Sequence, residues 1–231
     1  MIKKIENLFL LFFSIVVVSC RDDSGPYQEQ FVSYDIVQFV DQSNEGGTEF
    51  SFYLPDNMNE MIYITSGAVI DTTKVKPGER LLLGYIPETI PHVSGHIKAT
   101  GYSPIHNDAL RVSERGLENE MPDWKRDGIY LYSIWRMGPF INLHGKTVYS
   151  TDGRQFMILI DRSDVDDKNP APVLRIVNRM INPVDNFQRE FYASFDLTNL
   201  WAKEWIEGAT VELNNTNLPN DKFYFENLQK E

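Results

Sequence analysis

The residue with the clearest chemistry is Cys20, the single cysteine of this 231-residue chain. It directly follows Val17-Val18-Ser19, an order of aliphatic, aliphatic and small residues before a cysteine that is typical of a bacterial lipobox. A cysteine at this position receives a diacylglycerol on its thiol, and its amine is acylated once the preceding segment has been cut away. We therefore expect Cys20 to be the lipidation site.

The segment before this cysteine has the layout of a secretory signal. Lys3 and Lys4 precede an apolar run of eleven residues, 8–18, which is too short for a spanning helix of about 20 residues. We expect residues 1–19 to be a signal peptide, with an ordinary secreted protein or an uncleaved anchor as alternatives. Two or more acyl chains on one residue anchor a protein stably, whereas a single chain binds a bilayer only marginally.

The residues after Cys20 bear on the destination of the chain. Arg21-Asp22-Asp23 resembles the export signal that directs lipoproteins of Bacteroidota to the outer face of the outer membrane. A solvated linker and retention at the periplasmic leaflet are the alternatives. Residues 20–30 are polar and contain Gly and Pro, so we expect a lipidated, flexible tether.

The histidines offer little for metal binding. His92 and His96 have the i, i+4 spacing that binds a metal on a helix, but Pro91, Ser94 and Gly95 break any helix there. We expect both to be solvated loop residues.

An acidic run is the other candidate for a cation site. Calcium needs six to eight oxygen ligands in a defined loop, and the run does not follow the Asp-x-Asp-x-Asp-Gly pattern. We expect a solvated hairpin loop, with no metal and no cofactor. The residues of the run are Asp161, Asp164, Asp166 and Asp167.

No catalytic set emerges from the sequence. Ser94, Ser103 and Ser133 lack a Gly-x-Ser-x-Gly context, and no glycine loop suited to phosphate is present. We therefore expect no catalytic residues and no enzyme activity. Carboxylates for glycoside hydrolysis can be far apart in sequence, so a hydrolase acting on glycan or peptide stays an alternative.

Large aromatic side chains suggest a binding surface. Tyr130 and Tyr132 alternate with Ile129 and Leu131, so the two tyrosines share one face of a strand. Such a face is a candidate platform for stacking on sugars. We expect the tryptophans to be core residues. Trp201 and Trp205, for example, lie four residues apart and so on one side of an expected helix. The four tryptophans are Trp124, Trp135, Trp201 and Trp205.

Composition limits the class of partner. The formal net charge is −11, which disfavours sequence-independent binding to nucleic acid. Aromatic residues make up 13% of the chain and favour strands. With its one cysteine assigned to the anchor, the fold must depend on apolar burial and backbone hydrogen bonds.

The elements that position these residues fall into two groups of short strands. The first group occupies residues 31–108, where Phe50, Phe52 and Leu54 alternate as in a half-buried strand, and it predicts a small barrel. Residues 109–124 are expected to be a linker between domains. The strands of the first group are expected at 31–40, 48–54, 61–64, 81–86 and 95–102.

The second group predicts a β-sandwich over residues 125–231. A helix is expected at 198–205, capped by Asp196 or Thr198 and closed at Gly208. The fold class is thus all-β, a barrel followed by a sandwich. The strands are expected at 128–136, 140–143, 155–160, 172–177, 188–197, 209–213 and 222–225.

The layout resembles that of the NigD-like lipoproteins of Bacteroidota. The similarity is carried by the lipobox, by the stretch 75–85 (VKPGERLLLGY) with its Gly-x-Arg pattern, and by 189–197 (REFYASFDL) with its Tyr-x-Ser-Phe-Asp-Leu pattern. The resemblance implies an OB-like N-terminal barrel and a C-terminal β-sandwich. Members often have a histidine where this chain has Asn178, so no functional residue is carried over.

These features favour a non-catalytic binding or accessory lipoprotein of the cell envelope. The family resemblance implies a bacteriocin-associated or immunity-like role. The expected partners are the membrane, through the lipid, and an envelope protein, peptide or glycan. The alternatives are the hydrolase described above and a structural subunit of a surface assembly, which a large exposed apolar patch would favour.

Overall fold

The computed structural model describes residues 32–42, 47–54, 57–87 and 95–228. Val32–Glu231 form one compact unit. The predicted signal peptide and tether, including Cys20 and Arg21-Asp22-Asp23, lie outside the described residues, as does His92. None of the helices in the described ranges is long and apolar enough to cross a membrane.

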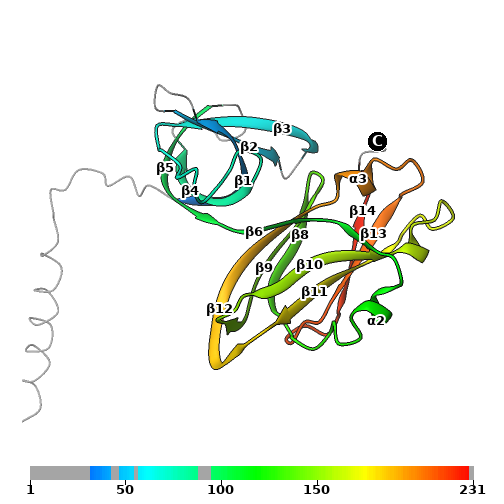
Figure 1. Cartoon of the computed structure of the whole chain (residues 1–231). Helices are drawn as coiled ribbons and strands as arrows, with labels where there is room; N and C mark the ends of the chain where they lie inside the picture. The colour runs from blue at the N-terminus through cyan, green and yellow to red at the C-terminus, as the bar shows by residue number, and fades with distance from the viewer. Residues whose placement is uncertain (1–31, 43–46, 55–56, 88–94, 229–231) are drawn as a thin grey trace, which may run out of the picture. The chain divides into compact units, whose positions relative to one another are not determined.

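Five strands form a closed barrel in the order β1-β2-β3-β5-β4 (Figure 1). The pairs are antiparallel except β3 with β5, which run parallel. This arrangement confirms the predicted OB-like barrel. The strands are β1 (Ser33–Gln42), β2 (Thr48–Leu54), β3 (Asn57–Ser66), β4 (Arg80–Pro87) and β5 (Gly95–Pro104).

Alternation along the strands builds the core of the barrel. Phe50 and Phe52 are buried and Leu54 packs against them, as the sequence pattern predicts. At the entry to β4, Gly78 has a φ of 91°, which favours glycine. Its N–H donates to the Phe39 carbonyl, and the Phe39 N–H donates to the Glu79 carbonyl, so this turn fastens β4 to β1.

Two further sheets face each other as a sandwich, which confirms the all-β fold class. The four-stranded sheet has the order β6-β12-β9-β8, and the five-stranded sheet has the order β14-β13-β11-β10-β7. The first contains β6 (His106–Ala109), β12 (Pro183–Asp196), β9 (Phe140–Ser150) and β8 (Tyr130–Met137). The second contains β14 (Lys222–Glu226), β13 (Gly208–Leu213), β11 (Val173–Met180), β10 (Arg154–Asp161) and β7 (Arg111–Ser113).

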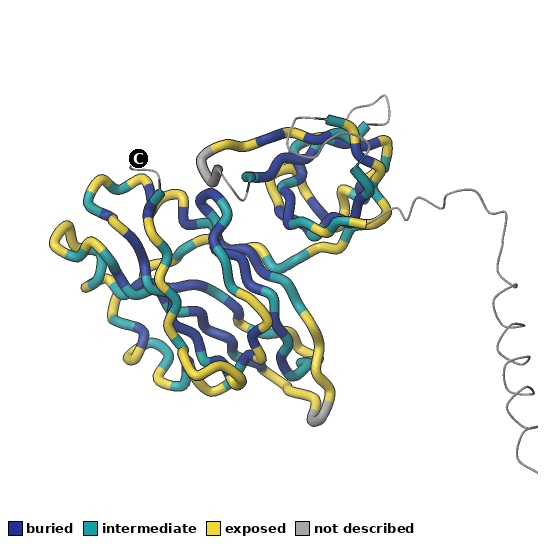
Figure 2. The backbone as a smooth tube through the Cα atoms, turned by 180° about the vertical axis from the view of Figure 1, so that it is seen from behind, coloured by how far each residue is buried: buried dark blue, intermediate teal, exposed yellow. Residues whose placement is uncertain are grey.

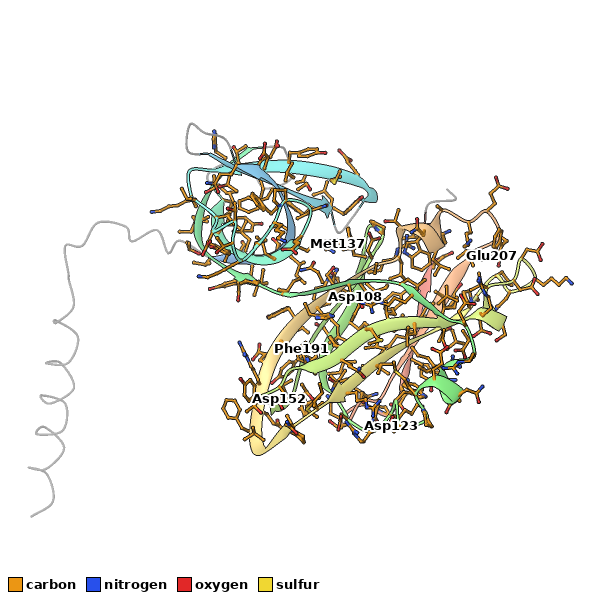
Figure 3. All side chains as sticks on the ribbon, viewed as in Figure 1. Asp108, Asp123, Met137, Asp152, Phe191 and Glu207 are labelled. Carbon is orange, nitrogen blue, oxygen red and sulfur yellow. The ribbon has the colours of Figure 1, made fainter. Side chains whose placement is uncertain are left out.

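The sandwich core lies between the sheets, and both contribute to it. Leu143 and Phe195 come from the four-stranded sheet, while Ile158 and Ile176 come from the five-stranded one. Figure 2 shows the buried positions gathered along the strands, and Figure 3 shows side chains filling the space between the two sheets. Trp201 is buried and Trp205 packs against this core, as predicted.

The segment expected as a linker, 109–124, is part of the sandwich. Strand β7, which lies within it, pairs in parallel with β10. Strand β6 begins in the expected barrel range 31–108, and it pairs in parallel with β12 of the sandwich. These strands have three and four residues and lie at sheet edges, so they carry little apolar alternation to reveal them.

The rest of this segment covers the outer face of the five-stranded sheet. It contains the short helix α2 (Leu117–Glu120). Leu117 and Trp124 pack on Leu159 and Val177, and the Trp124 indole N–H donates to Glu118 at 2.9 Å. Trp124 is therefore a core residue, as expected.

The predicted helix 198–205 is shorter in the structure. Helix α3 spans Thr198–Trp201, and Asp196 accepts hydrogen bonds from both the N–H and the hydroxyl of Thr198. The Trp201 indole N–H donates to the Pro139 carbonyl at 3.0 Å. The chain then continues in tight turns, in which the Ile206 N–H donates to the Lys203 carbonyl. The spacing of apolar residues in the sequence does not distinguish such turns from a continued helix.

Candidate functional site

The predicted platform residues lie on β8, at the edge of the four-stranded sheet. Tyr130 lies opposite Lys146 of β9, and the register shifts between Leu131 and Ser133, so Tyr132 is the extra residue of a bulge. Both tyrosines are exposed, at 39% and 47%. Strict alternation would place Ile134 on the same face as the two tyrosines. Because of the bulge, Ile134 instead lies opposite Leu143 and packs against the core.

The two tyrosines belong to a longer row of rings that crosses three strands. Tyr130 and Tyr132 meet edge to face with centroids 5.4 Å apart, and Tyr132 lies 4.7 Å from the His144 ring of β9. His144 stacks on Tyr192 of β12 at 4.1 Å with an interplanar angle of 5°. We call Tyr130, Tyr132, His144 and Tyr192 the aromatic row.

Two charged side chains flank the aromatic row. The Lys146 ammonium lies 4.4 Å from the Tyr130 centroid and 5.9 Å from that of Tyr132, within cation–π range. The Glu190 carboxylate lies 2.6 Å from the His144 Nε2. Partial burial, followed by the Glu190 charge, raises the pKa of the Tyr192 hydroxyl. The row thus offers flat apolar faces beside one cation and one anion.

Only the β8 part of this row could be predicted from the sequence. His144, Lys146, Tyr192 and Glu190 are brought to it by the pairing of β9 with β8 and with β12. Strand alternation correctly separates Tyr192 from Phe191, but only the register shows which neighbours it meets.

The other end of the same sheet face is covered by Arg80 of the barrel. Its guanidinium donates to the Asn142 side-chain oxygen at 3.0 Å, to the Ser194 hydroxyl at 2.8 Å and to the Ile36 carbonyl at 2.9 Å. It also lies 4.0 Å from the Phe140 ring centroid. The sheet face is therefore closed near the barrel and open at the aromatic row.

Arg80 brings together the two stretches that carry the family resemblance. It is the arginine of the Gly-x-Arg pattern, and Ser194 is the serine of the Tyr-x-Ser-Phe-Asp-Leu pattern. Burial lowers the pKa of Arg80 to about 9, and nearby Tyr53 and Asp196 act in the opposite direction. The guanidinium is therefore charged at neutral pH.

The acidic run has structural partners. The Asp161 carboxylate accepts from the Arg175 guanidinium at 2.7 Å and from the Leu117 N–H at 2.6 Å, while Asp164 ends the short 3-10 helix η1 (Arg162–Asp164). No group of three or more acidic, histidine or cysteine residues in the described ranges is placed to hold a metal ion. His96 Nδ1 lies 2.9 Å from the Thr65 hydroxyl.

Asn178 stands where the family often has histidine. It is buried, and its side-chain N–H groups donate to the Thr147 hydroxyl at 3.1 Å and to the Asp127 carbonyl at 3.3 Å. Here it joins the two sheets.

The register places Ser133 of β8 opposite His144 on one side and Tyr192 of β12 opposite it on the other. A nucleophilic serine needs a hydrogen bond to its base, and the base needs an orienting group. Glu190 orients His144, but among the described residues no hydrogen bond joins the Ser133 hydroxyl to the imidazole. The geometry is that of a surface row of rings in which one imidazole is hydrogen-bonded to a carboxylate.

Known proteins share this fold at low identity. No model of a known protein family matches the sequence, and no curated protein matches it. A protein of unknown function (DUF1344) from Bacteroides vulgatus superposes with a TM-score of 0.64 at 11% identity, over 85% of this chain and 90% of that chain. For a candidate lipoprotein from Bacteroides fragilis the TM-score is 0.63 at 8% identity, over 87% and 100%.

A NigD-like immunity protein from Bacteroides caccae is also similar, with a TM-score of 0.58 at 14% identity over 85% of this chain and 93% of that chain. Identities this low show the fold alone. At the level of fold, the resemblance to NigD-like proteins predicted from the sequence is confirmed.

Proposed function

We propose that this chain is a lipid-anchored protein of the cell envelope that binds a glycan through the aromatic row, without catalysis. The observation that carries the proposal is the row of four rings between Lys146 and Glu190, of which Tyr130 and Tyr132 are exposed and His144 and Tyr192 half-buried. The rings are tilted relative to one another, and an exposed tyrosine ring such as that of Tyr132 can stack on the apolar face of a sugar. The flanking ammonium and carboxylate supply a donor and an acceptor for hydroxyl groups.

The row is better suited to binding than to stability. Tyr130 and Tyr132 leave much of their apolar surface in water, whereas buried rings of the same size stabilise a core. Stacking between His144 and Tyr192, together with the His144–Glu190 hydrogen bond, fixes these side chains before a ligand arrives. A pre-organised surface loses less side-chain entropy on binding.

The anchor would place this surface in the envelope. The proposed lipid on Cys20 and the export signal Arg21-Asp22-Asp23 would hold the chain at the outer membrane, facing the cell exterior, with the periplasmic leaflet as the alternative. The lipid anchor is supported by the fold, because a candidate lipoprotein shares it. A NigD-like immunity protein shares it too. By that likeness we propose an accessory or immunity-like role.

A glycan array probed with the full chain in non-ionic detergent tests the binding site. We expect saturable binding that Tyr132→Ala weakens by about tenfold or more, since removal of a central contact residue commonly costs over 1 kcal/mol. Tyr224→Ala is the matched control, because Tyr224 is an exposed tyrosine on a strand of the other sheet.

Three results would count against the proposal. Binding of no glycan would remove its ligand class, and equal weakening by both variants would remove the aromatic row. Hydrolysis of a bound glycan or peptide, lost in Ser133→Ala, would replace binding by catalysis.

A further inference from the structure

A separate cavity of about 440 Å³ opens at one edge of the sandwich. β6 pairs with β12 only over residues 193–196, and β7 pairs with β10 only over 159–161. The remaining parts of β12 and β10 therefore have no strand on that side, and the cavity lies beside them. Leu82 and Ser103 of the barrel also line it.

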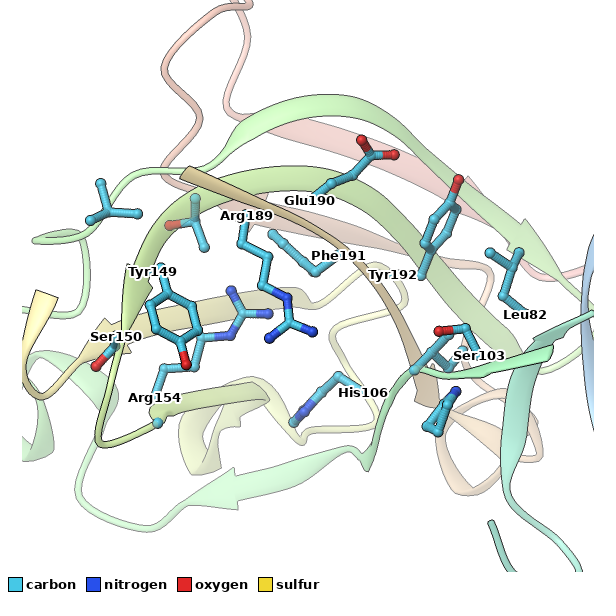
Figure 4. A pocket seen from close by; sticks show the side chains of 15 residues that line it. Leu82, Ser103, His106, Tyr149, Ser150, Arg154, Arg189, Glu190, Phe191 and Tyr192 are labelled. Carbon is cyan, nitrogen blue, oxygen red and sulfur yellow. The ribbon is translucent and has the colours of Figure 1, made fainter. Parts of the chain in front are cut away.

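Three basic side chains converge in this cavity. Figure 4 shows the guanidinium groups of Arg154 (β10) and Arg189 (β12) directed into it, with His106 (β6) beside them. The Arg154 guanidinium is held in place by two rings, at 4.1 Å from the Phe191 centroid and 4.7 Å from that of Phe156.

These two arginines differ from most other arginines of the sandwich. Arg136 also has no carboxylate partner among the described residues, but it donates to the Gly138 and Glu226 carbonyls. Arg111, Arg162 and Arg175 each pair with a carboxylate at 2.7–2.9 Å. Within the described part of the chain, Arg154 and Arg189 form no ion pair and no hydrogen bond to an acidic side chain. This is notable in a protein with 33 acidic and 22 basic residues.

The remaining polar groups do not neutralise the cavity. Glu190 is the one carboxylate among the lining residues, and it is already bonded to His144. The buried Nε2 atom of His106 has no hydrogen-bond partner among the described residues. Buried polar atoms are usually hydrogen-bonded, so this nitrogen is available to a bound ligand.

The charges of the cavity favour an anion. Burial, and then the charge of Arg189, lowers the pKa of Arg154 to about 10, so the Arg154 guanidinium keeps its charge at neutral pH. Burial and then Arg154 lower the pKa of His106, while Asp108 acts in the opposite direction. Two like charges in a partly desolvated cavity repel each other, and an anion between them would remove that cost.

We propose that this cavity binds a small molecule through a carboxylate or phosphate group held by Arg154 and Arg189. Guanidinium groups bind such oxyanions through paired N–H donors. The volume falls in the range of about 300–1,000 Å³ common for small-ligand pockets. Tyr192 and Glu190 also line this cavity, so it adjoins the aromatic row, but Arg154 and Arg189 are not part of that row.

Calorimetric titration of the full chain in non-ionic detergent tests the proposal. The probes are inorganic phosphate, glucuronate and, as a neutral sugar of similar size, glucose. We expect one-to-one, saturable binding of at least one anion and none of glucose. Binding of phosphate alone would identify a phosphate site, and binding of glucuronate alone would identify a carboxylate site.

Variants connect that binding to the cavity. Arg189→Gln is expected to weaken anion binding by about tenfold or more, since a charge-assisted hydrogen bond is lost. Arg115→Gln makes the same change of charge at an exposed arginine elsewhere and should leave the affinity within about twofold. Circular dichroism checks that each variant keeps its strands.

Several outcomes would overturn the proposal. The proposal fails if neither phosphate nor glucuronate binds, or if glucose binds as well as the anions do. It also fails if Arg115→Gln and Arg189→Gln weaken anion binding equally. The last result would show a diffuse charge effect in place of a site. A glycan bound at the aromatic row would respond to Tyr132→Ala and not to Arg189→Gln, so the two proposals can fail independently.

Discussion

Arg80 shows how one side chain can account for a motif that is hard to interpret in sequence. An arginine within a run of strand residues suggests an exposed position, yet Arg80 is buried. Its own backbone N–H and carbonyl are both bonded to the Asn107 side chain, and its guanidinium satisfies three oxygen acceptors. The arginine is therefore a polar connection between barrel and sandwich.

Replacement of this side chain should be costly. Arg80→Gln is expected to lower the free energy of unfolding by about 2–4 kcal/mol, because the shorter amide cannot reach all the acceptors and leaves buried oxygens unpaired. Urea unfolding measures the change. Arg115→Gln, at an exposed arginine, should stay within about 0.5 kcal/mol of the wild type. Equal stability of the Arg80 variant would contradict the buried connection.

His106 should make stability depend on pH. Its pKa in the folded protein is lowered from the ordinary value of 6.5, chiefly by burial, so the unfolded chain takes up a proton first as pH falls. The stability that neutral His106 contributes is therefore present above about pH 6.5 and lost below it, by at most about 1.4 kcal/mol per pH unit.

Urea unfolding at pH 7.5 and pH 5.5 tests this dependence. The wild type should lose more stability between these values than His106→Gln, since every other titrating group is common to both proteins. An identical loss in the two proteins would show that the imidazole does not resist protonation.

At the scale of elements, the sequence predicts strands better than it predicts their neighbours. The alternation of Phe50, Phe52 and Leu54 identifies a strand because side-chain direction has a period of two. The aromatic row depends instead on a bulge at Tyr132 and on the registers of three strands. Register depends on contacts distant in sequence, so only Tyr130 and Tyr132 could be selected in advance.

The segment 109–124 was predicted wrongly as a linker. It is charged, but in the structure it packs on the sandwich. Its apolar residues are few, but Trp124 and Leu117 complete a small core on the outer face of the five-stranded sheet. Charge content alone indicated a linker because the apolar partners, Leu159 and Val177, lie far along the chain.

Trp124 should therefore contribute strongly to stability. Trp124→Ala is expected to lower the free energy of unfolding by about 3–5 kcal/mol, as for large aromatic residues removed from a core. Trp124→Phe keeps much of the apolar contact and should cost distinctly less, although it loses the hydrogen bond to Glu118. Urea unfolding of both variants measures the difference. If Trp124→Ala left the free energy of unfolding unchanged, the segment would be a linker after all.

At the scale of the whole molecule, the barrel and the sandwich were predictable because each has its own group of locally patterned strands. The basic cavity was not, since Arg154, Arg189 and His106 come from three strands and the space exists only where two pairings end. Sites that arise from strand ends and sheet edges depend on topology, and single residue patterns carry no trace of them.

The proposed lipid on Cys20 should be what holds the folded part at the membrane. The net charge of −11 opposes adsorption to anionic headgroups, so we expect attachment to depend on that lipid. Cys20→Ser should move the protein from the membrane fraction to the aqueous fraction after cell lysis and detergent phase separation. Because the anchor precedes Val32–Glu231, its circular dichroism and unfolding midpoint should stay unchanged, whereas a variant that remains with the membrane would show that another element attaches it.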